Sequence, residues 1–272
     1  MIDTDLYIRR LVESVPLRES ALREAVRAQH LPPESQGLDV GCGIGFQTRL
    51  LAEALAPSGH VTGVDLSPAL LQYAEDSVQN TEISDRISFR EGDMHQLPFP
   101  DAAFDWVWST DCAGYPTGDL LPILQEFTRV VRPGGTVILM AWSGQTLLPG
   151  YPLLEARLNA TCSAYTPYLK EQRAEAHFLR ALSSYREAGL TEATAQTFVG
   201  DMQAPLSEGV RTALVSLFEM LWGERQPEVS PEDWAAYQRL CDPASSECIL
   251  DLPDYYGFFT YTLFRGKVAE KT

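Results

Sequence analysis

Basic residues are scarce in this sequence. The 272 residues include 21 Lys and Arg against 37 Asp and Glu, which gives a formal net charge of −16. A surface this acidic repels phosphate backbones and anionic lipid, and no run of Lys or Arg marks a local basic patch. The composition therefore argues against nucleic acid or a membrane surface as a partner and favours a small-molecule substrate.

Metal-ligand patterns and disulfide patterns are also missing. The five cysteines are scattered, no C-x-x-C pair occurs, and there are only four histidines. A zinc site needs clustered Cys and His ligands, so we expect no metal. An odd number of scattered thiols is typical of a reduced, cytoplasmic protein.

Long apolar runs are absent as well. No segment approaches the roughly 20 apolar residues of a membrane-spanning helix. The acidic start Met1–Asp5 leads into no apolar segment of the kind found in a signal peptide. Repeats, low-complexity segments and flexible linkers are not evident. With 45% hydrophobic and 21% charged residues, the composition predicts a globular cytoplasmic protein.

A glycine-rich stretch organises the rest of the chain. Residues 37–45 read G-L-D-V-G-C-G-I-G, and apolar residues at helical spacing follow. This order predicts a strand, a tight turn and a helix start, which together bring the backbone close to a nucleotide-like ligand. Glycine suits such a turn because it adopts positive φ and leaves room for the ligand.

The spacing of the glycines separates this stretch from two rival motifs. The dinucleotide fingerprint needs a third glycine where Phe46 stands, and the phosphate-binding loop needs a lysine that is absent. The remaining pattern, D-x-G-x-G-x-G, resembles the first motif of the class I S-adenosylmethionine (SAM) dependent methyltransferases. The resemblance implies a cofactor-binding set that begins with Asp39, Gly41, Cys42, Gly43 and Gly45.

A second acid follows at a suitable distance. Residues 60–65 alternate between polar and apolar side chains and are rich in β-branched residues. They end in Asp65, 20 residues after Gly45. In such folds an acid near this spacing binds the ribose hydroxyls. Asp65 and the adjacent Leu66 therefore join the cofactor-binding candidates. Ser67 and Pro68 then predict a capped helix start.

The most specific stretch lies at residues 92–105. Its letters G-D-M-H-Q-L-P-F-P-D-A-A-F-D are similar to the signature of the type 11 methyltransferase family, which includes the ubiquinone-biosynthesis C-methyltransferases. The resemblance implies that Asp93 binds the adenine amino group and that the Met94 backbone meets a ring nitrogen. His95 is considered as a base, but we expect a surface or hydrogen-bonded histidine.

Residues 104–109 predict a strand buried on both faces. By the resemblance, the backbone carbonyl of Ser109 at its end binds the methionine amine of the cofactor. Asp111 and Tyr115 are candidates to face the methyl acceptor, or equally to act as a cap or a packing contact. Residues 126–135, E-F-T-R-V-V-R-P-G-G, match a further family run, whose expected role is architectural: R-P-G-G ends a helix and leads into a fifth strand over 136–140. The resemblance covers about residues 37–142.

The second half of the chain matches no substrate-defining pattern. A helix over 170–189, a sixth strand over 193–199 and a seventh over 256–264 complete the predicted core, and the last two strands are expected to form an antiparallel edge. We predict an α/β, Rossmann-like, seven-stranded, mostly parallel sheet with helices on both faces. The chain is read as one domain: an N-terminal helical lead (1–36), a SAM-binding core (37–146), a helical cap (147–169 and 203–252) and the rest of the core (170–202 and 253–272). The cap is expected to cover the strand ends; the alternatives are that it only thickens the fold or that it forms a homodimer face.

The resemblance implies methyl transfer from SAM to a small molecule by an SN2 displacement, with S-adenosylhomocysteine (SAH) as product. The acceptor and its reacting atom stay open, and no catalytic residue is assigned. Two alternatives remain at this point: a nicotinamide-dependent oxidoreductase and a non-catalytic SAM-binding module.

Overall fold

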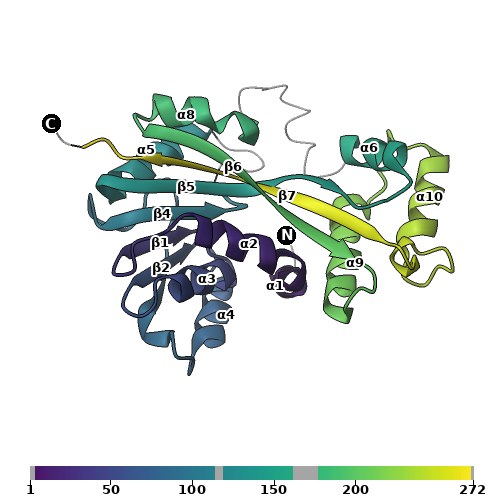
Figure 1. Cartoon of the computed structure of the whole chain (residues 1–272), viewed down its shortest axis with the longest axis horizontal. Helices are drawn as coiled ribbons and strands as arrows, with labels where there is room; N and C mark the ends of the chain where they lie inside the picture. The colour runs from purple at the N-terminus through teal and green to yellow at the C-terminus, as the bar shows by residue number, and fades with distance from the viewer. Residues whose placement is uncertain (1–3, 114–118, 162–176, 271–272) are drawn as a thin grey trace. The chain divides into compact units, whose positions relative to one another are not determined.

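A computed structural model describes residues 4–113, 119–161 and 177–270, and its centre is a seven-stranded sheet in the order β3-β2-β1-β4-β5-β7-β6 (Figure 1). The strands are β1 (Gln36–Val40), β2 (His60–Asp65), β3 (Ile87–Glu91), β4 (Phe104–Thr110), β5 (Val131–Thr146), β6 (Thr191–Gln203) and β7 (Tyr256–Lys267). β1 pairs in parallel with β2 and β4, β2 with β3, and β4 with β5. The carboxyl ends of these strands therefore lie along one edge of the sheet.

β7 runs against both of its neighbours. Toward β6, the Thr197 and Thr262 hydroxyls share a hydrogen bond of 3.1 Å, and the Thr191 hydroxyl donates to the Lys267 carbonyl at 3.3 Å. Residues further along β6 therefore pair with residues earlier in β7, which is the antiparallel arrangement. Toward β5, Gly134 N–H donates to the Val268 carbonyl at 2.9 Å. The mostly parallel sheet with an antiparallel end is confirmed.

Helices flank the sheet and connect its strands. The α-helices are α1 (Thr4–Glu13), α2 (Val15–Ala28), α3 (Phe46–Ala54), α4 (Pro68–Val78), α5 (Leu120–Val130), α6 (Pro152–Thr161), α8 (Ala181–Glu187), α9 (Glu208–Trp222) and α10 (Pro231–Cys241). The short 3₁₀ segments are η1 (Ser84–Arg86), η3 (Phe178–Arg180) and η4 (Ile249–Asp251). The helix predicted from Ser67 and Pro68 is confirmed: the Ser67 side chain accepts a hydrogen bond from Leu70 N–H, and Pro68 occupies the first turn.

The bounds of four elements differ from the sequence expectations. β5 begins at Val131, so the R-P-G-G run lies inside the strand and does not precede it. β6 and β7 extend beyond the predicted strands, because the antiparallel pair keeps its hydrogen bonds past the apolar residues on which the prediction rested. Residues 170–176 of the predicted helix lie outside the described part of the chain, and α8 begins at Ala181.

Both faces of the central strands are buried. Leu38 and Val40 of β1 belong to a core cluster shared with α5 and α8, whereas Asp39 between them points to the opposite face. On β4, Trp106, Val107 and Trp108 are all at most 1% exposed. A parallel sheet covered on both faces requires such continuous apolar strands.

By internal contacts the chain divides into two compact units. One unit holds Ala21–Trp142, Ala174–Phe198 and Tyr261–Thr272, and the other holds Met1–Ser20, Ser143–Arg173 and Val199–Thr260. The first contains β1 to β4 and all of the expected cofactor-binding residues. Strands β5, β6 and β7 each contribute residues to both units.

The second unit has an aromatic core of its own. Phe218 and Trp222 of α9 stack with ring centroids 5.6 Å apart, and Trp222 meets Tyr237 of α10 edge to face at 6.3 Å. The Trp222 indole N–H donates to Asn159 of α6 at 3.0 Å. The apolar residues of α9, which lies in the predicted cap segment 203–252, are thus core, as aromatic residues at helical spacing usually are. Among the described residues, no helix has the length and apolar character needed to cross a membrane.

Candidate cofactor site

The glycine-rich turn joins β1 to α3 in a backbone shape that only glycine adopts easily. Gly41, Gly43 and Gly45 have φ of 75°, 54° and 76°, and the left-handed region is costly for a residue with a Cβ. The N–H groups of Gly41 and Cys42 donate to the Val64 carbonyl at 2.8 and 3.0 Å, which ties the turn to the end of β2. Gly45 then caps α3.

Asp65 lies at the end of β2, next to this turn. One carboxylate oxygen accepts a hydrogen bond from Gly43 N–H at 3.0 Å, and the other accepts from Ser67 N–H at 2.9 Å. A carboxylate has about four lone-pair positions, so acceptor capacity remains for a ligand hydroxyl. The structure therefore places the acid predicted to bind ribose against the glycine turn. The following Leu66 is 61% exposed.

Asp39 is buried below the turn. Its side chain is 1% exposed and accepts a hydrogen bond from the Thr48 hydroxyl of α3 at 2.7 Å. Burial raises the pKa of Asp39 to about 7, the Thr48 hydrogen bond opposes the rise, and the negative charge of Asp65 adds to it. Thr48 was not predicted from the sequence, because its role depends on the packing of α3 on β1.

The end of β4 closes the turn from the other side. A Cβ on Gly41 would lie 2.3 Å from the Cys112 sulfur, so the two segments are in close contact. Burial, then Asp65, Asp39 and Asp111, raise the pKa of the Cys112 thiol to about 12, and burial likewise raises that of Cys42. Both thiols stay protonated at neutral pH, so neither is an activated nucleophile.

Ser109 and Asp111 precede Cys112. Ser109 is 1% exposed, and its hydroxyl accepts from Ala113 N–H at 3.3 Å. Asp111 has a positive φ of 52°, and its carboxylate accepts from Trp142 N–H of β5 and from the Tyr261 hydroxyl of β7, both at 2.8 Å. Of the two candidates for the acceptor side, Asp111 thus binds neighbouring strands, and Tyr115 lies outside the described residues.

Asp93 follows the end of β3. Its carboxylate is half exposed and accepts hydrogen bonds from the backbone N–H of His95 at 2.8 Å and from the His95 ring at 2.9 Å. These contacts hold the pKa of Asp93 below its usual value, the backbone bond contributing most. Met94 packs partly buried against the core cluster. His95 is the partner of Asp93 in this structure.

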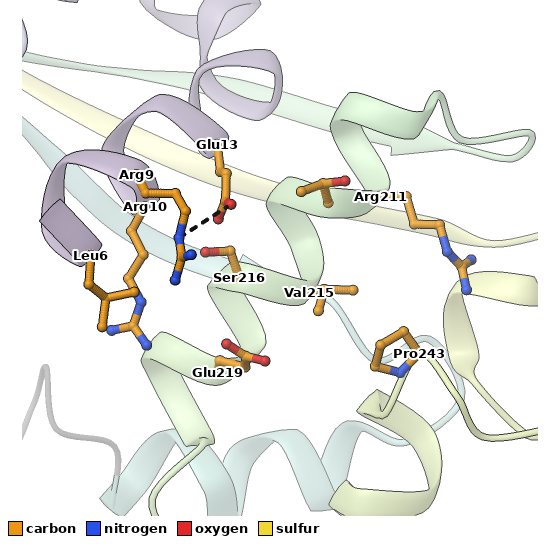
Figure 2. A pocket seen from close by; sticks show the side chains of 10 residues that line it. Leu6, Arg9, Arg10, Glu13, Arg211, Val215, Ser216, Glu219 and Pro243 are labelled. Carbon is orange, nitrogen blue, oxygen red and sulfur yellow. Dashed lines mark ion pairs between the residues drawn. The ribbon is translucent and has the colours of Figure 1, made fainter.

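The other unit has a cavity of about 370 Å³ between α1 and α9, shown in Figure 2. Arg9, Arg10 and Arg211 line it together with Glu13 and Glu219. Arg9 lies 3.9 Å from Glu13, and Arg211 pairs at 2.7 Å with Asp251 outside the lining. The acids balance the arginines, so the lining shows no preference for an anionic ligand, and we assign no role to this cavity.

The cofactor candidates, by contrast, converge. The turn after β1, Asp65 after β2, the segment after β3 and Cys112 after β4 occupy neighbouring ends of the sheet, because the strand order is β3-β2-β1-β4. Ligands of open α/β sheets bind at this edge. A turn with three glycines and several nearby carboxylates suit a nucleoside that carries a positive charge.

Comparison with known families agrees with this site. A family model described as "Methyltransferase domain" matches residues 38–135. The chain is 31% identical over 193 residues to the demethylmenaquinone methyltransferase of Bacillus licheniformis, an alignment that covers 66% of this chain and 81% of that protein. It is 38% identical over 128 residues to the enzyme of the same name from Lysinibacillus sphaericus, and this alignment covers 47% of this chain and 53% of that protein. For the first relatives of this kind, the chain spans about half of their length or less.

Solved structures show the same fold at low identity. The YcgJ protein of Bacillus subtilis superposes with a TM-score of 0.54 at 17% identity, over 93% of this chain and all of that one. A putative methyltransferase in complex with the Trm112 activator of Haloferax volcanii superposes with a TM-score of 0.56 at 20% identity, over 98% of this chain and 96% of that one. The glycine turn, the acids at the strand ends and these matches together establish that the chain belongs to the class I SAM-dependent methyltransferases.

Proposed function

We propose that this protein transfers a methyl group from SAM to a small-molecule acceptor and releases SAH. The observation that carries the proposal is the convergence of the Gly41–Gly45 turn, Asp65 and the end of β4 at one edge of the sheet, where Gly43 N–H binds Asp65 directly. The oxidoreductase alternative is abandoned, because family membership and the absence of the third fingerprint glycine at Phe46 both oppose it.

The residues present fit this cofactor. Asp65 has acceptor capacity left for the ribose hydroxyls, and the exposed Leu66 offers an apolar surface to the base. Asp93, with Met94, is proposed to bind adenine, since a carboxylate accepts from an exocyclic amine. Ser109 is proposed to bind the methionine amine through its carbonyl. Asp39, Gly41, Cys42, Gly43 and Gly45 form the floor and turn of the site.

When bound, SAM supplies a methyl group on a sulfonium: the acceptor atom forms the new bond to carbon while the C–S bonding pair leaves with sulfur. The chain then needs only to align the two reactants and exclude water. Asp111 accepts hydrogen bonds from Trp142 and Tyr261, so we assign it to shaping the end of β4. No general base is assigned, and one is needed only if the acceptor must lose a proton.

We infer a small-molecule acceptor from the acidic composition and from the names of the matched relatives. The relatives are named for demethylmenaquinone and tocopherol, but most of those alignments cover less than half of this chain. We propose that the chain acts as one methyltransferase domain in which the segments outside residues 38–135, the helices α6, α9 and α10 among them, determine the acceptor.

Calorimetric titration with SAM, SAH, NAD and NADP tests the cofactor. The wild type is expected to bind SAM and SAH but neither nicotinamide. Asp65→Ala should abolish this binding, whereas Asp76→Ala, which removes an exposed acid of α4, should leave it unchanged. Gly41→Ala should also abolish it, because a Cβ there meets Cys112 at a positive φ. Binding of NAD alone would overturn the proposal.

Incubation with methyl-labelled SAM and a small-molecule extract separates an enzyme from a binding module. Label that moves into a low-molecular-weight product, with release of one SAH per transfer, identifies a methyltransferase. Tight SAM binding with no transfer to any extract component would favour a non-catalytic SAM-binding module.

A further inference from the structure

Arg129 of α5 binds the loop that follows β3, although it lies outside the proposed cofactor contacts. Its guanidinium uses all five of its N–H groups. Two of them donate to Glu126, at 2.9 and 2.7 Å. Two reach backbone oxygens, of Phe99 at 2.9 Å and Leu97 at 3.2 Å, and the fifth donates to the Asp101 carboxylate at 2.9 Å. One side chain thus contacts three residues of the 97–102 loop.

Glu126 completes the attachment from the same helix. Its carboxylate accepts a hydrogen bond from Leu97 N–H at 2.6 Å, while Arg129 holds the Glu126 pKa below its usual value. The Arg129 carbonyl in turn accepts from Ala102 N–H at 2.9 Å. Both ends of the 97–102 loop are therefore fastened to α5.

The fastened loop bears directly on Asp93. Pro98 packs against Gly92 so closely that a Cβ on Gly92 would lie 2.8 Å from the proline ring. Gln96 N–H donates to the Asp93 carbonyl at 3.0 Å, which closes a tight turn between the two segments. The path from Arg129 to Asp93 thus runs through one anchored loop and one four-residue turn.

We propose that Arg129, with Glu126, is a positioning residue for the adenine subsite: it sets the place of Asp93 by fixing the 97–102 loop. This inference rests on the proposed function, in which Asp93 binds the adenine amino group. It also assigns a purpose to the E-x-x-R pattern, which the sequence suggested was only architectural. A lysine offers a single compact charge, so it cannot replace the five-donor contact.

The test compares two ligands by calorimetry on the full-length protein: SAH and S-inosylhomocysteine, in which a carbonyl replaces the adenine amino group. In the wild type, SAH should bind more tightly, because the inosine analogue places a carbonyl oxygen, which cannot donate, opposite the Asp93 carboxylate in place of the amino group. In Arg129→Gln, we expect SAH to weaken about tenfold, because a displaced Asp93 no longer makes a well-aligned hydrogen bond to the adenine amino group. The inosine analogue should change little, so the preference should shrink.

Arg132→Gln is the matched control. Arg132 lies three residues after Arg129, in β5, and pairs with Asp105, which is outside the 97–102 loop, so this variant should keep both affinities. Glu126→Gln, which keeps an acceptor for Leu97 N–H, should lose part of the preference and serves if Arg129→Gln does not fold.

The outcomes separate this inference from the proposed function. A wild type that binds neither ligand contradicts the proposed function. A wild type that binds SAH without preference over the inosine analogue overturns the inference alone. An Arg129→Gln variant that retains the preference, or that loses both ligands equally together with a lower melting temperature, shows a purely structural role and also overturns it.

Discussion

Single residues at the strand ends set the electrostatics of the site. Asp39 is an acid held in an apolar position: the sheet covers it, and Thr48 is its hydrogen-bond donor. In contrast, each carboxylate oxygen of Asp65 accepts a hydrogen bond from a backbone N–H group. The two acids therefore differ in their surroundings: Asp39 is buried inside the fold, and Asp65, which we propose binds the ribose, lies against the glycine turn.

Asp39 should make the free energy of unfolding depend on pH. Its pKa is raised from 3.8 to about 7 in the folded state, so between these values the unfolded chain releases a proton that the folded protein keeps. The contribution of Asp39 to the free energy of unfolding is therefore largest below about pH 4. It falls as the pH rises to about 7 and stays low above that pH. Asp39→Asn removes the titration and keeps an acceptor for Thr48.

We therefore expect the stability of Asp39→Asn relative to the wild type to increase from pH 5 to pH 8 in chemical denaturation. Asp76→Asn, at an exposed position of α4, should show no such trend. A difference that is constant with pH would contradict the assignment of the raised pKa to Asp39.

At the scale of elements, β1 and β4 fit together through a glycine and a tryptophan. Gly37 lies directly opposite Trp106 in the ladder, and a Cβ on Gly37 would lie 2.0 Å from the indole ring. The indole N–H donates to the Ser35 hydroxyl at 2.8 Å, which fixes the ring in place. This contact holds the two strands that carry the glycine turn and Ser109.

Gly37→Ala should therefore destabilise the protein by about 1–3 kcal/mol or more, the usual cost of overpacking. Trp106→Phe removes the part of the ring that the new methyl would meet, at the expense of the Ser35 hydrogen bond. In urea denaturation, the double variant should be more stable than the sum of the two single changes predicts. Strict additivity would contradict the steric account.

At the scale of the whole molecule, charge and fold point to the same kind of partner. The net charge of −16 opposes polyanions at long range, whereas the local site binds one cationic cofactor. We expect no binding of duplex DNA or transfer RNA in fluorescence anisotropy at roughly physiological salt. Saturable binding that weakens with added salt would reveal a basic surface that the composition hides.

Much of the cofactor site was predictable, because each motif is contiguous in the chain. The positive-φ turn needs glycines at fixed spacing, and an acid at the end of a strand is local to that strand. The predicted strands β1, β2 and β4 and the roles of Gly41, Gly43 and Gly45 as turn residues agree with the structure. Ligand contacts of these residues stay predictions until binding is measured.

The residues that face the methyl acceptor could not be predicted from the sequence. Asp111 was equally a candidate for the acceptor or for packing, and only the fold shows its hydrogen bonds to Trp142 and Tyr261. Sequence patterns carry information about neighbours three or four residues apart, not about strands that meet from distant parts of the chain. The unassigned cavity between α1 and α9 illustrates the same limit, since its lining comes from residues 6–13 and 211–243, about 200 residues apart in the sequence.

The sequence by itself determined the cofactor class, since glycine spacing, strand-end acids and charge are properties of short segments and composition. Tertiary structure alone decided which of these groups touch. Gly43 binds Asp65 across 22 residues, and Arg129 reaches Phe99 across 30. Such contacts follow from the strand order β3-β2-β1-β4, which brings distant strand ends side by side and so turns separate motifs into one site.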